Sequence, residues 1–443
     1  MTTVILAEKP SQMRDIAKVI GIKGSRDGYI ELVNGWIATH AVGHLLEQAQ
    51  PEDYDPAWGG RWNWNQLPML PTAWKSAPVK RTLAQFKVIK TLLASADTCI
   101  IATDAGREGE LIAREILEYV RFKGTVKRFW TSSMVEADVR KALNNLLDGS
   151  ATYPLFEAAR ARARSDFMLG LSGTRAASLA ANVRGDFFAL GRVKTPTLAM
   201  VVRRDETIEA FGAKKYFELE ATVTTAKGHT VKLLHARAEE DRIVDKKVAQ
   251  GLLEKARGAK APLKVEKVAE SESAPLPYSL PALQKDANRV LSLSAQNTLK
   301  TVQALYEKKV LTYPRTDCSY LAESQVAEID GVLNAVRASL PAQVDELRKV
   351  GVTVRKSVFN DAKLTDHHGI IPTAQAAVGL AGVELQVYTL VAHRYMQAIA
   401  PDCKFTSTRV SMDANGVPFR TTGKTITDPG WTRFKLGADE AAE

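Results

Sequence analysis

Two strand–turn–helix units, each with an acidic residue directly after the strand, constrain the fold of this 443-residue chain more than any other feature. The apolar run Val4–Ala7 predicts a buried strand, and a helical spacing of apolar residues follows Glu8, with Ser11 as the expected helix cap. The run Cys99–Thr103 repeats the pattern and leads through Asp104 into a second amphipathic helix. Such repeats predict a parallel α/β sheet, whose ligands bind beyond the carboxyl ends of the strands.

Glu8 and Asp104 are therefore expected at the same edge of the sheet. Two carboxylates at strand ends suit Mg²⁺, which prefers hard oxygen ligands, and Glu108 and Glu110 are close enough in the sequence to join them. The alternative is that acidic residues near a helix N-terminus only complement the helix dipole. The sequence contains no Walker A or G-x-G-x-x-G pattern, which argues against a nucleotide-hydrolysing motor or a dinucleotide enzyme.

The charge balance suits a polyanionic partner. Lys and Arg total 60 against 50 Asp and Glu, which gives a net charge of +10 and a pI near 9.3. The excess is local, because residues 151–204 hold nine basic and three acidic residues within a stretch that we predict to be helical. The alternative for this stretch is a solvated helix face without a ligand.

Cysteine usage and hydropathy indicate the compartment. The three cysteines are widely separated and form neither a zinc spacing nor an evident disulfide framework, which is typical of a reducing cytoplasm. The N-terminal apolar run is too short for a signal peptide, and no stretch approaches the roughly 18 apolar residues of a membrane span. We expect a cytoplasmic protein without a membrane-spanning segment.

The second half of the chain alternates between strand and helix patterns, and the total length predicts several domains. Residues 217–225 and 230–236 predict antiparallel strands, and residues 257–278 predict a hinge or connector. A helix at Leu280–Val290, followed by one capped by Ser294, is typical of a winged-helix module. Residues 404–420 predict strands that return to the sheet left near residue 257.

The segment Lys308–Tyr320, KKVLTYPRTDCSY, places a tyrosine, an arginine and an aspartate within five residues. In an extended strand, Tyr313 and Arg315 project to the same side, and a fixed cation favours the phenolate form of tyrosine. A phenolate can act as a covalent nucleophile, and an arginine matches the paired oxygens of a phosphodiester. The alternative is a Tyr-Pro turn in which Tyr313 is a packed aromatic side chain.

This segment resembles the nucleophile motif of type IA DNA topoisomerases, Tyr-x-Arg-Thr/Ser-Asp. Further blocks follow the family's order over nearly the whole chain: AEKPSQ at 7–12, GHLLE at 43–47, EDYDP at 52–56, ATDAGREGELIA at 102–113, GRVKTPTLAMVVRRDE at 191–206 and HHGIIPT at 367–373. The chain is most similar to the bacterial topoisomerase III branch of this family.

The resemblance implies a multidomain fold that combines α/β, α and β parts. Its parts are a Toprim parallel sheet, a helical DNA-binding domain, a β-rich gate arch and a winged-helix-like domain that carries the nucleophile. The expected boundaries are 1–148 for the Toprim domain, 149–212 for the first part of the helical domain, 213–272 for the gate, 273–400 for the winged-helix-like domain and 401–443 for the return to the gate.

The resemblance also implies three sets of site residues. The catalytic set is Tyr313, Glu8, Lys9, Arg315 and His367, and the Mg²⁺ set is Glu8, Asp104 and Glu108. The DNA-binding set is Arg162, Asp166, Arg175, Ala189, Leu190, Gly191, Arg192, Val193 and Lys194. Three positions depart from the family pattern: Gly106 replaces the second aspartate of Asp-x-Asp-x-Glu, Lys194 replaces a glutamine, and Gly369 stands where alanine is common.

The implied activity is ATP-independent strand passage. Tyr313 would cleave one DNA strand through a 5′-phosphotyrosine link, another strand would pass, and resealing would relax negative supercoils or decatenate duplex DNA. We expect a monomer that binds single-stranded, supercoiled or catenated DNA. Because family members normally continue with a further C-terminal segment, two alternatives stay open: a truncated fragment that binds or cleaves single strands without strand passage, and a partner that supplies the segment. A Toprim nuclease or primase is a weaker alternative, because it does not account for the Tyr313 motif.

Overall fold

The computed structural model describes residues 2–131, 134, 136–182, 186–237 and 242–436, and it divides into two compact units. The first unit contains Met1–Glu206 together with two short later segments, Thr316–Gln325 and Asn360–His368. The second unit contains Thr207–Arg315, Val326–Phe359 and Gly369–Glu443. The end of the Tyr313 motif, from Thr316 onward, and the segment that carries His367 therefore both belong to the N-terminal unit. The five domain boundaries expected from the sequence stay a prediction.

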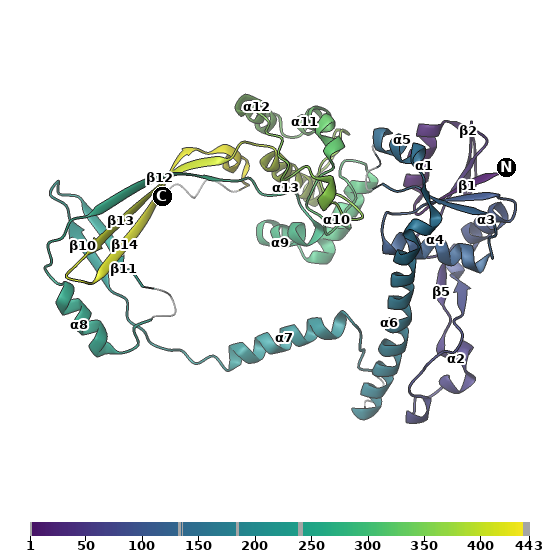
Figure 1. Cartoon of the computed structure of the whole chain (residues 1–443), viewed down its shortest axis with the longest axis horizontal. Helices are drawn as coiled ribbons and strands as arrows, with labels where there is room; N and C mark the ends of the chain where they lie inside the picture. The colour runs from purple at the N-terminus through teal and green to yellow at the C-terminus, as the bar shows by residue number, and fades with distance from the viewer. Residues whose placement is uncertain (1, 132–133, 135, 183–185, 238–241, 437–443) are drawn as a thin grey trace. The chain divides into compact units, whose positions relative to one another are not determined.

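A seven-stranded mixed sheet forms the centre of the first unit (Figure 1). Its strand order is β2-β3-β4-β1-β7-β8-β9, with β4, β1, β7 and β8 parallel and the outer pairs antiparallel. The strands are β1 (Thr3–Ala7), β2 (Ile22–Arg26), β3 (Tyr29–Leu32), β4 (Ile37–His40), β7 (Thr98–Ala102), β8 (Thr125–Arg128) and β9 (Leu147–Asp148), and β5 (Leu46–Gln48) and β6 (Ser76–Pro78) form a separate pair. The prediction of a parallel sheet is confirmed for its centre, whereas the edges are antiparallel.

Helices cover both faces of this sheet, because its central strands are apolar on both sides. Val4 and Leu6 of β1 pack with residues of α3 and α4, whereas Ile5 and Ala7 pack with residues of α1 and α5. The helices of the unit are α1 (Pro10–Ile20), α2 (Pro51–Tyr54), α3 (Leu83–Ala94), α4 (Arg107–Tyr119), α5 (Glu136–Asn144), α6 (Tyr153–Ala180) and α7 (Lys194–Glu209), the last of which continues into the second unit.

Helix α1 begins two residues earlier than the sequence predicts. Lys9 occupies the N-cap position, Pro10 is the first helical residue, and Ser11 lies inside the helix, so the prediction of a Ser11 cap is wrong. A proline suits the first helical position, because its missing N–H has no intrahelical partner there. The early start places Lys9 and Gln12 directly after the end of β1.

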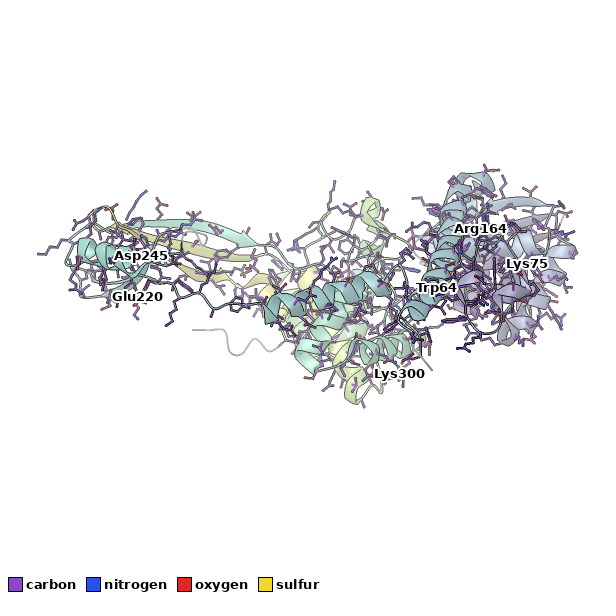
Figure 2. The ribbon with its side chains drawn as sticks, turned by 90° about the horizontal axis from the view of Figure 1, so that it is seen from below. Trp64, Lys75, Arg164, Glu220, Asp245 and Lys300 are labelled. Atoms are coloured by element: carbon purple, nitrogen blue, oxygen red, sulfur yellow. The ribbon has the colours of Figure 1, made fainter. Side chains whose placement is uncertain are left out.

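The long helix α6 packs against a tryptophan-rich loop (Figures 1 and 2). The ring of Phe167 lies 5.4 Å from Tyr54 and 5.6 Å from Trp74, centroid to centroid. Arg164 lies over the Trp74 ring at 5.0 Å. These contacts fix the loop to the helix rather than leaving its aromatic rings available, although Trp64 remains 57% exposed.

The second unit contains a five-stranded antiparallel sheet of order β10-β11-β14-β13-β12 (Figure 1). Its strands are β10 (Glu220–Thr224), β11 (Thr230–His235), β12 (Lys264–Glu272), β13 (Cys403–Asp413) and β14 (Pro418–Asp428). Asp245, labelled in Figure 2, caps helix α8 (Lys246–Ala256), because its carboxylate accepts a hydrogen bond from Lys247 N at 2.7 Å. The predicted strands at 217–225 and 230–236 and the predicted return near residue 404 are confirmed.

The predicted connector at 257–278 is wrong, because β12 lies within it. This strand pairs with β13 from Lys264↔Ser411 to Glu272↔Cys403. It is an edge strand with side chains mostly exposed, so it carries no apolar face that a hydropathy pattern could reveal.

Five helices complete the second unit: α9 (Leu280–Leu291), α10 (Ala295–Glu307), α11 (Ile329–Arg337), α12 (Pro341–Val350) and α13 (Gly382–Ala398). The predicted cap is confirmed, because Ser294 Oγ accepts a hydrogen bond from Asn297 N at 3.2 Å. The predicted strand at Tyr313 is wrong. Leu311 forms an isolated bridge with Pro372, and the fully described stretch Thr312–Tyr320 contains no strand. Pro314 lacks the N–H that a strand ladder requires at its position.

Within the described parts of the chain, the search for a helix long and apolar enough to cross a bilayer finds none.

Candidate active site

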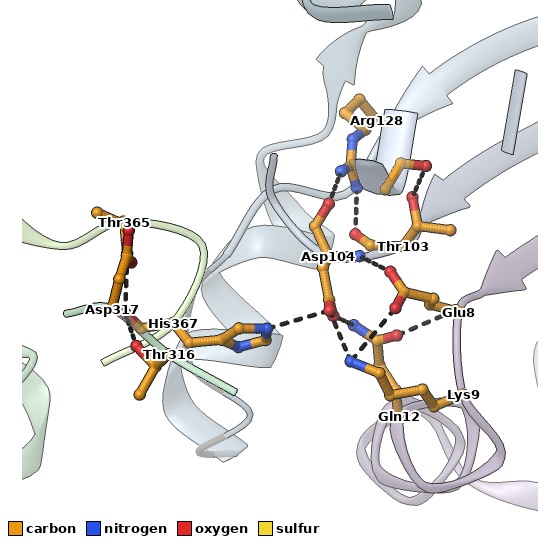
Figure 3. A network of polar contacts seen from close by, with 11 residues as sticks. Glu8, Lys9, Gln12, Thr103, Asp104, Arg128, Thr316, Asp317, Thr365 and His367 are labelled. Carbon is orange, nitrogen blue, oxygen red and sulfur yellow. Dashed lines mark hydrogen bonds and ion pairs between the residues drawn. The ribbon is translucent and has the colours of Figure 1, made fainter. Parts of the chain in front are cut away.

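Glu8 and Asp104 meet at the carboxyl edge of the central strands (Figure 3). Strands β1 and β7 are parallel neighbours with Ala7 opposite Ala102, so the residues that follow them emerge side by side. Asp104 N donates a hydrogen bond to Glu8 Oε2 at 3.2 Å. The strand pattern in the sequence predicts this meeting, and the structure confirms it.

The first turn of α1 adds a cation and an amide to the pair. Lys9 Nζ lies 2.6 Å from Asp104 Oδ2 and 3.3 Å from Glu8 Oε1. Gln12 Nε2 donates to Asp104 Oδ1 at 3.3 Å, and Gln12 Oε1 accepts from Glu8 N at 3.0 Å. Lys9 was expected in the site, whereas Gln12 was missed, although it belongs to the AEKPSQ block.

His367 joins the same carboxylate from the far end of the sequence. Its Nε2 lies 3.1 Å from Asp104 Oδ2, across 263 positions of the chain. The side chain of Thr316 donates to the His367 carbonyl at 3.5 Å, and Thr365 Oγ1 donates to Asp317 Oδ1 at 3.1 Å. The two later segments of the unit are thus held to each other, and they deliver His367 to Asp104 (Figure 3).

The cluster shifts the proton affinities of its two carboxyls in opposite directions. Burial and, next, the negative charge of Asp104 raise the pKa of Glu8. Burial alone would raise the pKa of Asp104, but the hydrogen bond and charge of His367 together with Lys9 outweigh it and lower that pKa. Asp104 is therefore a stable anion, whereas Glu8 is the carboxyl suited to exchange a proton.

A buried arginine supports the turn that carries Asp104, and no sequence signal pointed to it. Arg128 is fully buried, and it donates to the Thr103 carbonyl at 2.8 Å and to the Asp104 carbonyl at 2.7 Å. Glu110 is fully buried as well, and it accepts from Arg128 Nε at 2.5 Å and from Arg114 Nε at 2.6 Å. Glu110 is thus an internal ion-pair partner rather than a member of the acidic edge.

Glu108 has a different set of partners from Glu8 and Asp104. It forms an ion pair with Arg162, and its Oε2 lies 3.5 Å from His44 Nε2. Its side chain is about half exposed and borders a cavity of about 950 Å³ in the first unit. Cationic side chains of this cavity are Arg107, Lys141 and Arg162. The role of Glu108 as a metal ligand stays a prediction.

The expected DNA-binding residues lie on α6 and on the loop before α7, and they differ in exposure. Arg192 forms a two-pronged ion pair with Asp166, at 3.0 and 3.2 Å, and both side chains are exposed. Val193 and Lys194 are exposed too, whereas Ala189 and Gly191 are partly covered. The main-chain N–H of Leu190 donates to Thr174 Oγ1 at 2.9 Å, which ties the loop to α6.

Arg175 differs from the rest of that set. It is 6% exposed, and its guanidinium donates to the Trp58 carbonyl at 2.7 Å and to Gln66 Oε1 at 3.0 Å. The observed contacts of Arg175 fasten the tryptophan-rich loop to α6, so any contact with DNA stays a prediction.

Tyr313 and Arg315 belong to the second unit. The ring of Tyr313 is half-buried and meets Tyr306 edge-on at 5.5 Å. Thr312 is fixed beside it by a hydrogen bond from its N–H to the Ile371 carbonyl at 3.0 Å. Arg315 is exposed.

Comparison with known proteins decides the family. The Toprim domain family matches residues 3–134, and the DNA topoisomerase family matches residues 150–443. This chain belongs to the type IA DNA topoisomerases. Together, the two matches take in both the acidic cluster and the Tyr313 segment.

The chain is similar to curated relatives named DNA topoisomerase 3 from several bacteria. It is 37% identical to that of Shouchella clausii, over 99% of this chain and 60% of the relative. It is 36% identical to that of Bacillus subtilis, over 100% of this chain and 60% of the relative. It is also 36% identical to that of Salmonella typhimurium, over 99% of this chain and 70% of the relative. The chain thus spans about 60% of the length of the first two relatives. These similarities assign it to the bacterial topoisomerase III branch.

A solved structure supports the fold of this chain. Full-length topoisomerase I from Thermotoga maritima matches with a TM-score of 0.62 at 19% identity, over 97% of this chain and 67% of that one. At this identity the likeness concerns architecture alone.

The Toprim domain of type IA topoisomerases is generally a fold that binds divalent metal ions. The residues at the β1 and β7 ends fit such an ion, because Glu8 and Asp104 offer hard oxygen donors. The ammonium group of Lys9 already forms ion pairs with both Glu8 and Asp104. Within the described residues, no group of three or more His, Cys, Asp or Glu side chains is spaced to hold a metal.

Proposed function

We propose that this chain carries the cleavage machinery of an ATP-independent DNA topoisomerase that cuts one strand, passes another and reseals the first. The observation that supports this most directly is that the Glu8–Lys9 dipeptide, Asp104 and His367 meet from three separate parts of the sequence. A purely structural salt bridge does not need a proton-exchanging carboxyl, a lysine and a histidine at one strand edge.

In the proposed reaction, Tyr313 first gives up its hydroxyl proton to solvent, and the phenolate oxygen attacks a phosphorus atom of single-stranded DNA. A phosphotyrosine ester forms on the 5′-phosphate, and the bond to the 3′-oxygen breaks. That oxygen takes a proton as it leaves, and Glu8 is the donor that we propose, because its raised pKa favours the protonated form. A phenolate is itself a good leaving group, so the reverse attack by the 3′-hydroxyl reseals the strand without a nucleotide.

Cations compensate the charge that builds up on the phosphoryl oxygens. We assign this role to Lys9 and to Arg315, whose planar guanidinium matches two oxygens at once. His367 is a further donor toward the phosphate, and its contact with Asp104 fixes the orientation of the ring.

Mg²⁺ is the metal that we propose for the carboxylate cluster, with Glu8 and Asp104 as ligands and Glu108 as a further candidate. When bound there, the ion would neutralise and position the DNA backbone beside the cut. The chain's own residues carry the proton transfer and the covalent step.

Single-stranded DNA is the proposed substrate of the α6 and α7 region, with negatively supercoiled or catenated duplexes as the larger substrates. Lys194 and Arg192 are exposed cations that suit phosphates, and Val193 offers an exposed apolar side chain beside them. We propose that the protein acts in the cytoplasm as a monomer.

Trapping the covalent intermediate tests the proposal. An oligonucleotide labelled at its 3′ end should become attached to the protein, whereas the same oligonucleotide labelled at its 5′ end should release a free labelled fragment. Tyr313→Phe should abolish the adduct, and Tyr306→Phe, the neighbouring tyrosine, should retain it. An adduct that persists in Tyr313→Phe, or one that carries the 5′ label, contradicts the proposal.

Relaxation of a supercoiled plasmid is measured beside the adduct. Relaxation with the adduct indicates complete strand passage. An adduct without relaxation indicates the narrower activity, a fragment that cleaves single strands without passing a second strand.

A further inference from the structure

Helix α7 differs from the other described α-helices, because none of its residues is buried. Each of the others holds at least one buried residue, whereas the whole of Lys194–Glu209 is described and stays at the surface. A helix of its length, 16 residues, is marginal in water unless it packs through an apolar face. Its β-branched residues lower the intrinsic helix propensity further: Thr195, Thr197, Val201, Val202, Thr207 and Ile208. Helix α7 therefore lacks the buried apolar contacts that would stabilise it.

The large apolar side chains of α7 form a stripe along one side of the helix. Leu198 and Val202 are one turn apart, and they are 62% and 44% exposed. Val201 and Ile208 are exposed on the same side, at helical spacings of three and seven residues. Met200 is 70% exposed, but it lies two positions from both Leu198 and Val202 and so points to the opposite side. We call Leu198, Val201, Val202 and Ile208 the α7 stripe.

The charges beside the α7 stripe favour a polypeptide over a nucleic acid as its cover. Asp205 lies three positions after Val202 and three before Ile208, so its carboxylate is on the apolar side. Glu209 follows one turn later. Aliphatic side chains offer no ring on which a base can stack, and carboxylates repel phosphates. The α7 stripe suits an amphipathic helical segment with apolar side chains opposite Leu198 and Val202 and a basic side chain opposite Asp205.

The length of the relatives indicates where such a segment occurs. The match takes in 99% of this chain for Shouchella clausii and all of it for Bacillus subtilis. It covers 60% of each relative, so two fifths of each relative has no counterpart in these 443 residues. A stretch of that size is long enough to contain several helices.

We propose that the α7 stripe is the docking surface for a helical polypeptide equivalent to the part of the longer relatives beyond the match, supplied as a separate molecule. The inference concerns assembly and does not depend on the cleavage chemistry. Docking buries the α7 stripe and stabilises the helix. It thereby fixes the orientation of Lys194, the first residue of α7 and one of the cations that we assign to DNA.

Hydrogen exchange of the full 443-residue chain tests the docking. The probe is the part of the Bacillus subtilis relative beyond the match, added as a separate polypeptide. Residues 194–209 should exchange rapidly in the chain alone, as an unpacked helix does, and at least about tenfold more slowly with the probe. Slow exchange of α7 in the chain alone would overturn the proposal, because the helix would then be packed within the chain itself.

Substitutions on the two sides of α7 test the stripe. Leu198→Ser/Val202→Ser should weaken binding of the probe, measured by titration calorimetry, more than about tenfold, because central apolar contacts dominate an interface. Met200→Ser is the matched control, since it removes an exposed apolar side chain from the opposite side, and it should keep the affinity within about twofold. All these side chains are exposed, so the circular dichroism and the urea midpoint of the chain should stay unchanged. Equal losses of affinity in the two variants would overturn the assignment.

A fusion of the same probe to the C-terminus of the chain keeps the test decisive if the separate polypeptide does not fold. Rapid exchange of residues 194–209 in the fusion would overturn the proposal. Dimerisation of the chain alone that Leu198→Ser/Val202→Ser abolishes would overturn it in favour of a second copy, and protection of α7 by a single-stranded oligonucleotide would overturn it in favour of DNA. The covalent adduct of Tyr313, measured without the probe, reports on the proposed function separately.

Discussion

The acidic cluster and the loop before α7 both carry predicted site residues, but they hold their charges in different ways. At the cluster, Asp104 is bonded by Lys9, Gln12 and His367, and its main chain is bonded by the buried Arg128. At the loop, Arg192 and Asp166 form one exposed ion pair. Buried charges need several partners because desolvation is costly, whereas an exposed pair is screened by water and contributes little to stability.

The comparison teaches where a mutation acts. A change in the cluster should alter folding and catalysis together, because the groups that react are also the groups that hold the turn. A change in the loop should alter DNA binding and leave the fold unchanged. The predictions below run from the largest expected effect to the smallest.

Arg128→Met should produce the largest loss of stability. It leaves Glu110 with one of its two cationic partners and removes the donors to the Thr103 and Asp104 carbonyls. Breaking a buried pair in this way costs about 3–5 kcal/mol. Urea unfolding of the first-unit transition measures it, and Arg192→Met is the matched control, with an expected loss below about 1 kcal/mol. Equal losses of unfolding free energy in Arg128→Met and Arg192→Met would contradict the difference between the acidic cluster and the loop before α7.

Gly109→Ala should have the next largest effect. A Cβ atom there would collide with the main-chain oxygen of Asp104, which cannot move without shifting the turn. We expect a loss of about 1–3 kcal/mol, the usual cost of overpacking, together with weaker adduct formation. Gly191→Ala is the control in the loop, because its Cβ would meet only Lys194 Cβ at 3.9 Å, an ordinary contact. A stable, active Gly109→Ala variant would contradict the close packing of the turn.

The two carboxyls of the cluster should respond to pH with opposite signs. The pKa of Asp104 is lowered in the folded state from an ordinary value of 3.8, so its stabilising contribution is present at neutral pH and is lost as the pH falls below that value. The pKa of Glu8 is raised from 4.5, so the folded state holds that proton more tightly and loses stability as the pH rises past 4.5.

Replacing each carboxyl by its amide separates the stabilising effect of Asp104 from the destabilising effect of Glu8. At pH 7, Asp104→Asn should lower the free energy of unfolding, and Glu8→Gln should raise it while abolishing proton transfer. The Glu8→Gln difference should shrink in acid, where both the folded and the unfolded state hold the proton. The Asp104→Asn difference should also shrink, because the unfolded chain takes up a proton at that carboxyl before the folded protein does. Chemical unfolding at several pH values measures this, with Asp166→Asn as the exposed control. A Glu8→Gln variant that is less stable at pH 7 would contradict the raised pKa of Glu8 in the folded state.

Lys194→Ala should have the smallest effect on the fold and a selective effect on binding. Each phosphate contact to a single strand contributes about 0.7 to the slope of log affinity against log salt concentration, so this slope should fall by about that amount. Anisotropy of a labelled oligonucleotide at several salt concentrations measures it, and Lys246→Ala, an exposed lysine on α8, should leave the slope unchanged. An unchanged slope in Lys194→Ala would remove this lysine from the proposed interface.

The local pattern of the sequence predicted the elements that are apolar on a regular period or capped by a suitable residue. The strands before Glu8 and Asp104, the Ser294 cap and the strands of the second sheet follow from such patterns. The same patterns failed at β12, which lacks an apolar face, and at Tyr313, where Pro314 ends any ladder. At β12 the conformation depends on pairing with β13, and at Tyr313 it depends on the missing main-chain N–H of Pro314.

The sequence by itself determined that two acidic residues follow parallel strands and that a Tyr-x-Arg motif of the topoisomerase family lies far downstream, because both are encoded in short stretches. Only the tertiary structure decided that His367 bonds to Asp104 and that Arg128 supports the turn from inside. These contacts join residues distant in the chain, and no local periodicity records which side chains come within a few ångströms after folding.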